Sequence, residues 1–311
     1  MTTSIIFMGT PDFSVLPLQA LYDRGFHISL VISQPDRPKG RGQKMIATPV
    51  KKKALDLGLN VIQPMSVNQP DVIAQVESLK PDFFVVVAFG QFIGEKLLSL
   101  PCYAPINIHG SLLPAYRGAA PIQRAIINGE TTTGITTMLM DKGMDSGDML
   151  LKEELMILPS DTTATLHDRL SLVGARLIVE TIEAFMENRI TPQPQDPEKA
   201  TVAPMLKKAE GLTNWTRTAR ELDCFIRGMN PWPGAYTFLS DKRFKLFKAE
   251  YMDLDHDQAP GTILECDSDR LIVQAGQKAI SILEIQGESG KRLPIADFLR
   301  GVTFKKGDIF R

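Results

Sequence analysis

The sequence has few cysteines and no apolar run long enough to cross a membrane as a helix. Its three cysteines, Cys102, Cys224 and Cys266, lie far apart, without the paired spacing of a disulfide framework or a zinc site. We therefore expect three packing residues in a reducing compartment. A transmembrane helix needs roughly 20 apolar residues. No run approaches that length and no basic leader precedes the first apolar stretch, so we expect a cytoplasmic protein without a membrane partner.

The chain also lacks an excess of one charge, because 35 Lys and Arg are set against 36 Asp and Glu. A net charge of −1 gives no sign of a polyanionic partner, but the basic residues are unevenly distributed. Between Gln34 and Lys53 the only acid is Asp36, and the basic residues there are Arg37, Lys39, Arg41, Lys44, Lys51, Lys52 and Lys53. The last three are expected to begin a helix.

Short apolar runs alternate with helical patterns in the first half of the chain, which predicts a mostly parallel sheet covered by helices. The run Phe83–Ala88 is apolar on both faces, as in the middle of such a sheet. A long helix is expected over 161–186, with Asp161 or Thr162 as its cap. The expected strands are 4–8, 27–33, 60–62, 83–88, 106–109, 134–140 and 148–154.

A proline-rich polar stretch divides the chain. It predicts a surface linker over 190–209, between a first domain of residues 1–189 and a second of residues 210–311. In the second domain a helix is expected near 216–228. Short apolar runs with Gly or Asp breaks follow, which is typical of a small β-barrel or sandwich.

Three glycine-containing motifs fail the tests of the sites they suggest. "MGTPDF" has only Gly9 where a dinucleotide-binding loop needs three glycines. "GESGKRLP", near Lys291, has the wrong spacing for a triphosphate loop and predicts a hairpin turn. "DKGMDSGD" places Gly143 at a ligand position of a calcium loop. We therefore expect no dinucleotide and no metal.

One constellation remains. Asn107 and His109 are two residues apart in a predicted strand, so both point to the same side, at the strand end where open α/β sheets bind ligands. Asp145 lies in the glycine-flanked turn "GMDSG" and could reach them. An amide, an imidazole and a carboxylate could stabilise an oxyanion and remove a proton, which suits acyl transfer without an enzyme nucleophile.

The same residues also have ordinary explanations. A histidine near a strand end is often a hydrogen-bonded packing residue, and an Asn or Asp in a turn often caps the backbone. The other histidines, His27, His167 and His256, are isolated. Residue spacing alone leaves both interpretations open.

The stretches "NIHGSLLPAYRGAAPIQ", "MDKGMDSGDM" and "IIFMGTPDFS" resemble those of the folate-dependent formyltransferases, and the resemblance extends in order along most of the chain. It implies a Rossmann-like formyltransferase domain with a mostly parallel sheet that binds 10-formyltetrahydrofolate. It also implies a smaller OB-like β-barrel domain that binds tRNA. In particular, the chain resembles family members that formylate the α-amine of methionyl initiator tRNA.

The resemblance assigns catalysis to Asn107, His109 and Asp145. It implies folate binding by two segments, with the residues Val87, Ala88, Phe89, Gly90, Phe92, Ser111, Leu112, Leu113 and Pro114. A family loop that enters the acceptor stem matches Gln34–Lys51, where the prolines and glycines predict no regular structure. The expected tRNA contacts are Arg37, Lys39, Arg41 and Lys44, with Arg41 matching the family's key arginine.

Other acceptors use the same three catalytic groups in the family: a purine-pathway ribonucleotide, an amino sugar nucleotide, or water in a formate-releasing hydrolase. A non-catalytic RNA-binding module is a further alternative. The basic insert favours tRNA, since mobile basic loops suit phosphate neutralisation. We expect a monomeric enzyme.

Overall fold

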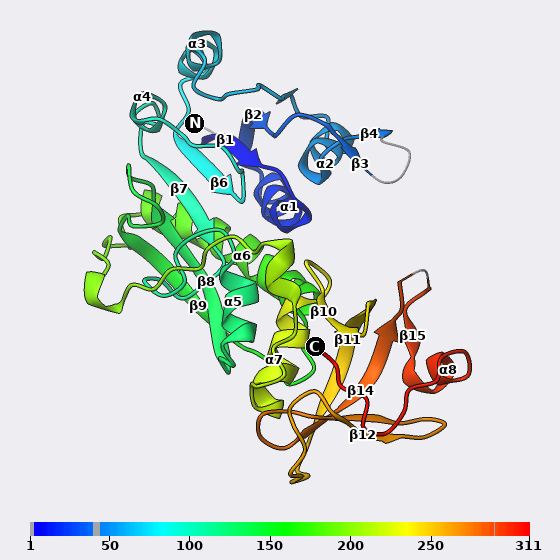
Figure 1. Ribbon diagram of the computed structural model, residues 1–311. Coiled ribbons are helices and arrows are strands. Elements are labelled where there is room, and N and C mark those ends of the chain that lie inside the picture. The colour runs from blue at the N-terminus through cyan, green and yellow to red at the C-terminus, as the bar shows by residue number, and fades with distance from the viewer. Residues whose placement is uncertain (1–2, 40–43, 289) are drawn as a thin grey trace. The chain divides into compact units, whose positions relative to one another are not determined.

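The computed structural model describes residues 3–39, 44–288 and 290–311, which form two compact units (Figure 1). Each unit combines separate stretches of the chain. The first contains Met1–Gly118, Thr133–Met156 and His167–Ala203, and the second contains Ala119–Thr132, Ile157–Leu166 and Pro204–Arg311.

The first unit is built on a seven-stranded sheet in the order β5-β2-β1-β6-β7-β8-β9. The pairs from β5 to β7 are parallel and β7 pairs with β8 antiparallel, so the predicted mostly parallel sheet is confirmed. The strands are β1 (Ser4–Gly9), β2 (His27–Ile32), β5 (Val61–Ile62), β6 (Phe83–Val87), β7 (Ala104–His109), β8 (Thr132–Leu139) and β9 (Met149–Met156).

The strand order reverses between β1 and β6. From β1 the chain runs outward to β2 and β5, then returns to β6 on the other side of β1. In open α/β sheets, ligands bind beyond the carboxyl ends of the strands at such a reversal. The residues that follow β1 and β6 therefore lie where a binding site is expected.

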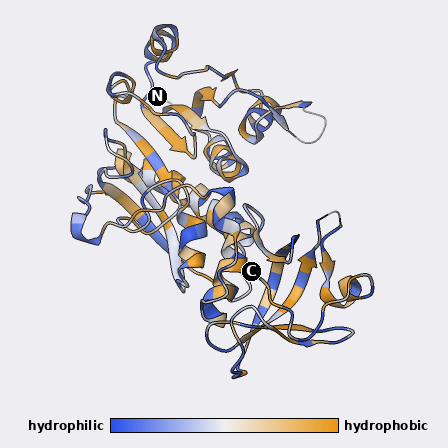
Figure 2. Cartoon of the chain, in the orientation of Figure 1, coloured by the Kyte–Doolittle hydropathy of each residue, from blue (hydrophilic) through white to orange (hydrophobic). Residues whose placement is uncertain are grey.

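Apolar strands and helices build the core of this unit. All five residues of β6 are buried, as the sequence predicted, and Figure 2 shows apolar residues concentrated in β1 and β6. Helix α6 (Thr163–Met186) contacts the sheet, because Phe185 packs edge-on against Phe83 and the Thr181 hydroxyl lies 2.9 Å from that of Thr137. The other helices are α1 (Val15–Asp23), α2 (Pro49–Asp56), α3 (Pro70–Ser78) and α4 (Glu95–Leu98).

The basic insert contains regular structure, contrary to the expectation from its prolines and glycines. Strands β3 (Arg37–Lys39) and β4 (Lys44–Ile46) pair antiparallel, with Pro38 opposite Met45. A two-stranded ribbon leaves one edge of each strand unpaired, so the missing N–H of a proline need not cost a ladder hydrogen bond. The predicted helix at the three lysines is confirmed as α2, which Thr48 caps.

The second unit contains an antiparallel sheet in the order β10-β11-β14-β13-β12, with β15 paired to β14. This confirms the small β domain, including the hairpin connection before β15. Helix α7 (Ala219–Met229) packs against β11 and against α5 (Pro121–Ile127). The remaining elements are β10 (Ala235–Leu239), β11 (Lys242–Met252), β12 (Ile263–Cys266), β13 (Leu271–Gln274), β14 (Ala279–Gln286), β15 (Leu293–Pro294) and α8 (Ile295–Leu299).

The cysteines are all free thiols. Cys224 and Cys266 are half-buried, and burial raises the pKa of both thiols. Cys102 is exposed, so the expectation that it packs in a core was wrong. In the described parts of the chain, no helix has the length and apolar character that a membrane span requires.

Candidate active site

Asn107 and His109 lie in the last three residues of strand β7. Because side chains alternate along a strand, both point to the same face of the sheet. Both are buried, with 9% and 5% of their surface exposed. Strand β8 runs antiparallel beside β7, pairing Thr136 with His109. The loop that joins β8 to β9 carries Asp145 and returns it to the same end of β7.

The carboxylate of Asp145 is where these groups meet. Its Oδ1 lies 3.5 Å from Asn107 Nδ2, and its Oδ2 lies 3.6 Å from His109 Nδ1. The same Oδ2 accepts a hydrogen bond of 2.8 Å from the backbone N–H of Gly118. Only this last contact has the length of a good hydrogen bond. The three predicted catalytic residues are therefore brought together, with the two side-chain contacts still loose.

One ring nitrogen of His109 contacts a backbone carbonyl. Its Nε2 lies 2.9 Å from the carbonyl oxygen of Tyr116, and a carbonyl can only accept, so Nε2 carries a hydrogen. The other ring nitrogen, Nδ1, faces Asp145. The two ring nitrogens of His109 therefore face different partners, the Tyr116 carbonyl and the Asp145 carboxylate.

The local sequence explains how Asp145 reaches this place. Its backbone has φ +51°, a left-handed conformation that aspartate tolerates better than most residues. Asp141 stabilises the turn by accepting from the Gly143 N–H at 2.8 Å. A side chain at Gly147 would meet the carbonyl oxygen of Leu139 at 2.0 Å, so only glycine fits there. Within the described residues, no group of three or more His, Cys, Asp or Glu could hold a metal ion.

A cavity of about 570 Å³ lies beyond the carboxyl ends of β1, β2 and β6, at the reversal of the strand order. Ala88, Phe89 and Gly90, three of the predicted folate residues, line it. Val87 is fully buried at the end of β6, and Phe92 is 72% exposed.

The second predicted folate segment does not line this cavity. Ser111 and Leu113 are buried, and Leu112 and Pro114 are half-buried. The hydroxyl of Ser111 donates to the Ala115 carbonyl at 2.6 Å. This hydrogen bond shows that Ser111 supports the turn after β7.

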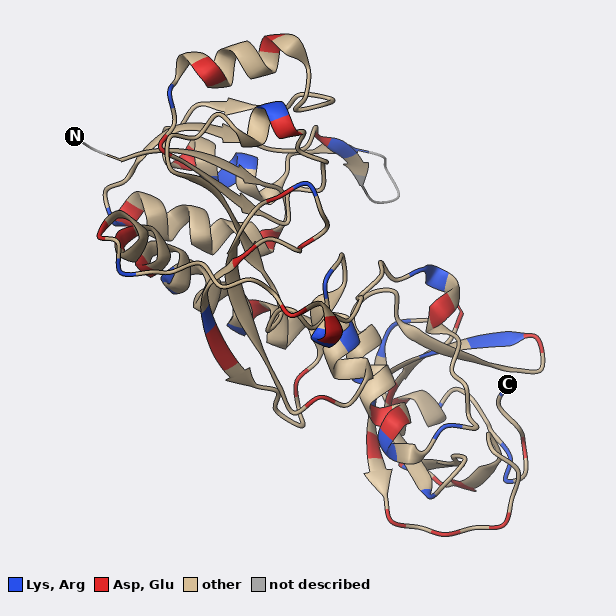
Figure 3. Ribbon diagram, turned by 90° about the vertical axis from the view of Figure 1, so that its left-hand side faces the viewer, with Lys and Arg blue, Asp and Glu red and all other residues tan. Residues whose placement is uncertain are grey.

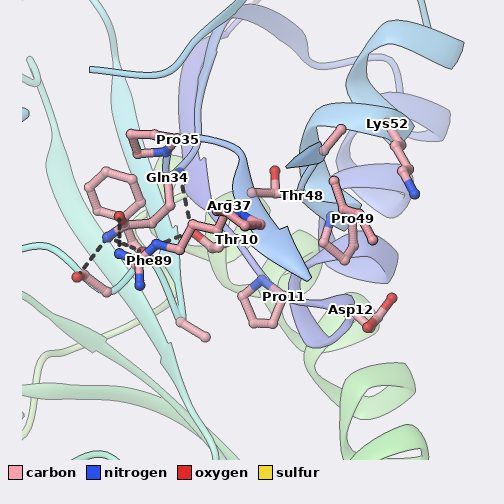
Figure 4. Close-up of a pocket in the computed structure, with 15 residues that line it drawn as sticks. Thr10, Pro11, Asp12, Gln34, Pro35, Arg37, Thr48, Pro49, Lys52 and Phe89 are labelled. Carbon is pink, nitrogen blue, oxygen red and sulfur yellow. Dashed lines mark hydrogen bonds between the residues drawn. The ribbon is translucent and has the colours of Figure 1, made fainter. Parts of the chain in front are cut away.

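Gln34 connects the loop after β6 to the basic hairpin, as Figure 4 shows. Its Nε2 donates to the Gly90 carbonyl at 2.8 Å, and Arg37 Nη2 donates to its Oε1 at 3.4 Å. Thr10, after β1, donates to the Phe89 carbonyl at 2.8 Å. Sequence reasoning missed Gln34, because its role depends on contacts distant in the chain.

Hydrogen bonds anchor the base of the basic hairpin. Lys51 and Gln63 each donate a hydrogen bond of 2.7 Å to the Asp36 carboxylate. These two hydrogen bonds hold the pKa of the Asp36 carboxyl below its ordinary value. Arg37 and Lys44 are exposed, and Figure 3 shows Lys and Arg in blue along the ribbon. Lys39 ends β3, whereas Arg41 lies outside the described residues. Lys52, which the sequence analysis expected only to begin a helix, lines the cavity together with Arg37.

Comparison with known protein families identifies the family of this chain. A family profile described as formyl transferase matches residues 3–182, which is more than half of the chain. A second profile, formyl transferase, C-terminal domain, matches residues 205–303. The chain belongs to the formyl transferase family.

Relatives of this formyl transferase cover it almost completely. A methionyl-tRNA formyltransferase from Citrifermentans bemidjiense is 46% identical over 305 residues, which is 98% of this chain and 95% of the relative. Among solved structures, WlaRD, a sugar 3N-formyl transferase crystallised in the presence of dTDP and 5-N-formyl-THF, matches with a TM-score of 0.68. It is 17% identical and covers 94% of this chain and 100% of its own.

HypX from Aquifex aeolicus, solved in complex with tetrahydrofolic acid, matches with a TM-score of 0.62 and 18% identity. The match covers 99% of this formyl transferase and 50% of the HypX chain, so this chain spans about half the length of that protein. At such identities the two structures show a shared fold. The predicted Rossmann-like and OB-like architecture is confirmed.

Proposed function

We propose that this formyl transferase moves a formyl group from 10-formyltetrahydrofolate to the α-amine of methionyl initiator tRNA. The near-complete match to a relative named methionyl-tRNA formyltransferase supports this acceptor. The chemistry is supported by one observation: Asn107 and His109 converge on the Asp145 carboxylate at the end of β7.

The reaction joins the amine nitrogen to the formyl carbon, and negative charge develops on the formyl oxygen. Asn107 Nδ2 and the Nδ1–H of a His109 imidazolium, whose second hydrogen is on Nε2, are the donors we assign to that charge. Both now make contacts of 3.5 and 3.6 Å to Asp145, so a ligand oxygen can be bound without breaking a strong hydrogen bond. Removing one such donor typically costs about 10²–10³ in rate.

The attacking amine needs no enzyme nucleophile. A free α-amine titrates near about 7.7–8.0, so a useful fraction is neutral at pH 7. After attack the nitrogen must lose a proton, and the folate nitrogen must gain one as its bond to the formyl carbon breaks. Asp145 is the base we assign to the first transfer, directly or through water, and its side chain is 20% exposed. General acid–base assistance contributes typically about 10²–10⁴.

We assign the cavity at the strand reversal to substrate binding, although none of the three residues assigned to catalysis lines it. Ligand pockets commonly measure roughly 300–1,000 Å³, and this one measures about 570 Å³. We assign its wall of Ala88, Phe89 and Gly90 to donor binding, as in the family resemblance. Arg37 and Lys52 on another wall supply the positive charge that suits phosphates of the acceptor.

The exposed hairpin residues Arg37 and Lys44, together with Lys39 and Arg41, are assigned to phosphates of the tRNA acceptor stem. Contacts of this kind fix the position of a nucleic acid and carry no sequence information. A monomer acting in the cytoplasm is part of the proposal. Light scattering after size exclusion tests the monomer, and a dimer mass would contradict it.

The function is tested with purified protein, 10-formyltetrahydrofolate and charged initiator tRNA, by measuring formyl-methionine after deacylation. We expect formyl-methionine to form at a rate that depends on the tRNA concentration. No product, with a donor shown to be active, would reject the proposal. Formate released equally fast without tRNA would favour the hydrolase instead.

A further inference from the structure

A single side chain from the proline-rich segment, Gln195, holds both loops of the candidate active site. Its Nε2 donates to the backbone carbonyls of Asp145 and Gly147, each at 2.8 Å. Its Oε1 accepts from Arg117, from Nε at 2.9 Å and from Nη2 at 2.7 Å. A carboxamide offers two N–H donors and one oxygen with two lone pairs, so this side chain is fully used.

The two residues next to Arg117 in the chain, Tyr116 and Gly118, each contribute a backbone group that contacts a side chain assigned to catalysis. The carbonyl of Tyr116 accepts from His109, and the N–H of Gly118 donates to the Asp145 carboxylate. Fixing Arg117 therefore fixes the supports on both sides of it. Gln195 reaches the Asp145 turn and the Arg117 turn at the same time.

Backbone hydrogen bonds place Gln195 for this task. On its N-terminal side, Gln193 exchanges two hydrogen bonds with Met149, of 2.8 and 2.9 Å. On its C-terminal side, Arg117 donates to the Thr201 carbonyl at 2.8 Å and accepts from Ala203 at 2.6 Å. The segment predicted as a surface linker thus lies against the first unit as far as residue 203. Backbone hydrogen bonds therefore hold the segment on both sides of Gln195.

We propose that Gln195 is a positioning residue for formyl transfer, which holds the Asp145 carboxylate in reach of Asn107 and His109. This inference rests on the function proposed above. Asp145 has a left-handed backbone that is sparsely populated by residues other than glycine, so its turn needs outside support to persist. Gln195 supplies that support through the Asp145 carbonyl itself.

Gln195→Ala removes all four hydrogen bonds of the side chain. A displacement of about 1 Å at a reacting group can cost about 10²-fold in rate. We therefore expect kcat to fall by about 10- to 100-fold. KM for both substrates should change by less than about threefold, since the side chain is assigned to neither binding wall.

Gln193→Ala is the matched control. It is the same substitution two residues away, at an exposed side chain, and its hydrogen bonds to Met149 use only backbone atoms. We expect this variant to keep the wild-type kcat. Gln195→Glu keeps the shape and the acceptor for Arg117 but loses both donors to the Asp145 turn. Its kcat should fall as in Gln195→Ala; a wild-type kcat would overturn the proposal.

A double-mutant cycle separates positioning from a general loss of structure. In an Asp145→Asn background, Gln195→Ala should lower kcat little further, because residues that act as one unit are not additive. Fully additive losses would overturn the proposal. Melting temperatures of all variants show whether each is folded. If Gln195→Ala does not fold, Gln195→Glu takes its place in the kinetic comparison. If the wild-type protein shows no formyl transfer, the proposed function is rejected. If the wild type is active and Gln195→Ala has the same kcat as Gln193→Ala, only this inference is rejected.

Discussion

Asn107→Ala tests the proposed oxyanion donor most directly. The substitution removes one contact to Asp145 that is 3.5 Å long, at a residue with 9% of its surface exposed. A net hydrogen bond contributes about 0.5–1.5 kcal/mol to stability, and a contact this long belongs at or below the lower end. The same donor acting on a developing oxyanion is worth roughly 2.7–4 kcal/mol, or about 10²–10³ in kcat. Activity should thus fall far more than stability.

The assay measures the rate of single-turnover formylation with saturating folate and charged tRNA. The thermal unfolding of each variant is measured in parallel. Asn60→Ala is the matched control, because the Asn60 side chain is exposed and the hydrogen bond described for this residue uses its backbone carbonyl, which accepts from Val31. Asn107→Asp places a second carboxylate about where the amide now stands, 3.5 Å from Asp145 Oδ1, and should be less active still. If Asn107→Ala formylates as fast as the Asn60 control, the donor role is refuted.

Three further predictions concern the hairpin and the turn after β7. Arg41→Ala should raise KM for tRNA and leave folate binding nearly unchanged; equal loss of both would mean that the arm supports the fold. Asp36→Asn should lower stability at pH 7 by up to about 1 kcal/mol. Because Lys51 lowers the Asp36 pKa, this difference should vanish in unfolding curves as the pH falls below 3.8. Gly118→Ala puts a methyl 2.9 Å from the Ala203 carbonyl, at φ +115°, and should lower both kcat and melting temperature.

Sequence patterns predicted the parts of this protein that depend on local chemistry. The run Phe83–Val87 is apolar on both faces, and it became a fully buried central strand. Asn107 and His109 are two residues apart, and the strand period alone put them on one face. Each of these predictions needed only the residues themselves and the geometry of an extended chain.

Contacts that depend on topology could not be predicted in this way. Gln195 lies 50 residues from Asp145 and 78 from Arg117, in a stretch whose prolines and polar residues are typical of a linker. The β3–β4 hairpin was missed because proline cannot donate to a strand ladder and usually argues against a strand. Pro38 lies in a two-stranded ribbon, where one edge of each strand is unpaired and the missing N–H need not matter. No periodicity in the sequence carries either signal.

The hydrogen-bond lengths divide the candidate site into a support and a reactive centre. Bonds that hold the loops, from Gln195 to Asp145, from Gly118 to Asp145 and from His109 to Tyr116, measure 2.8 to 2.9 Å. The contacts among the three side chains assigned to catalysis measure 3.5 and 3.6 Å. Catalytic hydrogen bonds are often long without substrate and tighten in the reacting complex. A rigid support around loose reactive contacts is what electrostatic catalysis requires, because donors must be held in place yet remain free to bind the charge that forms.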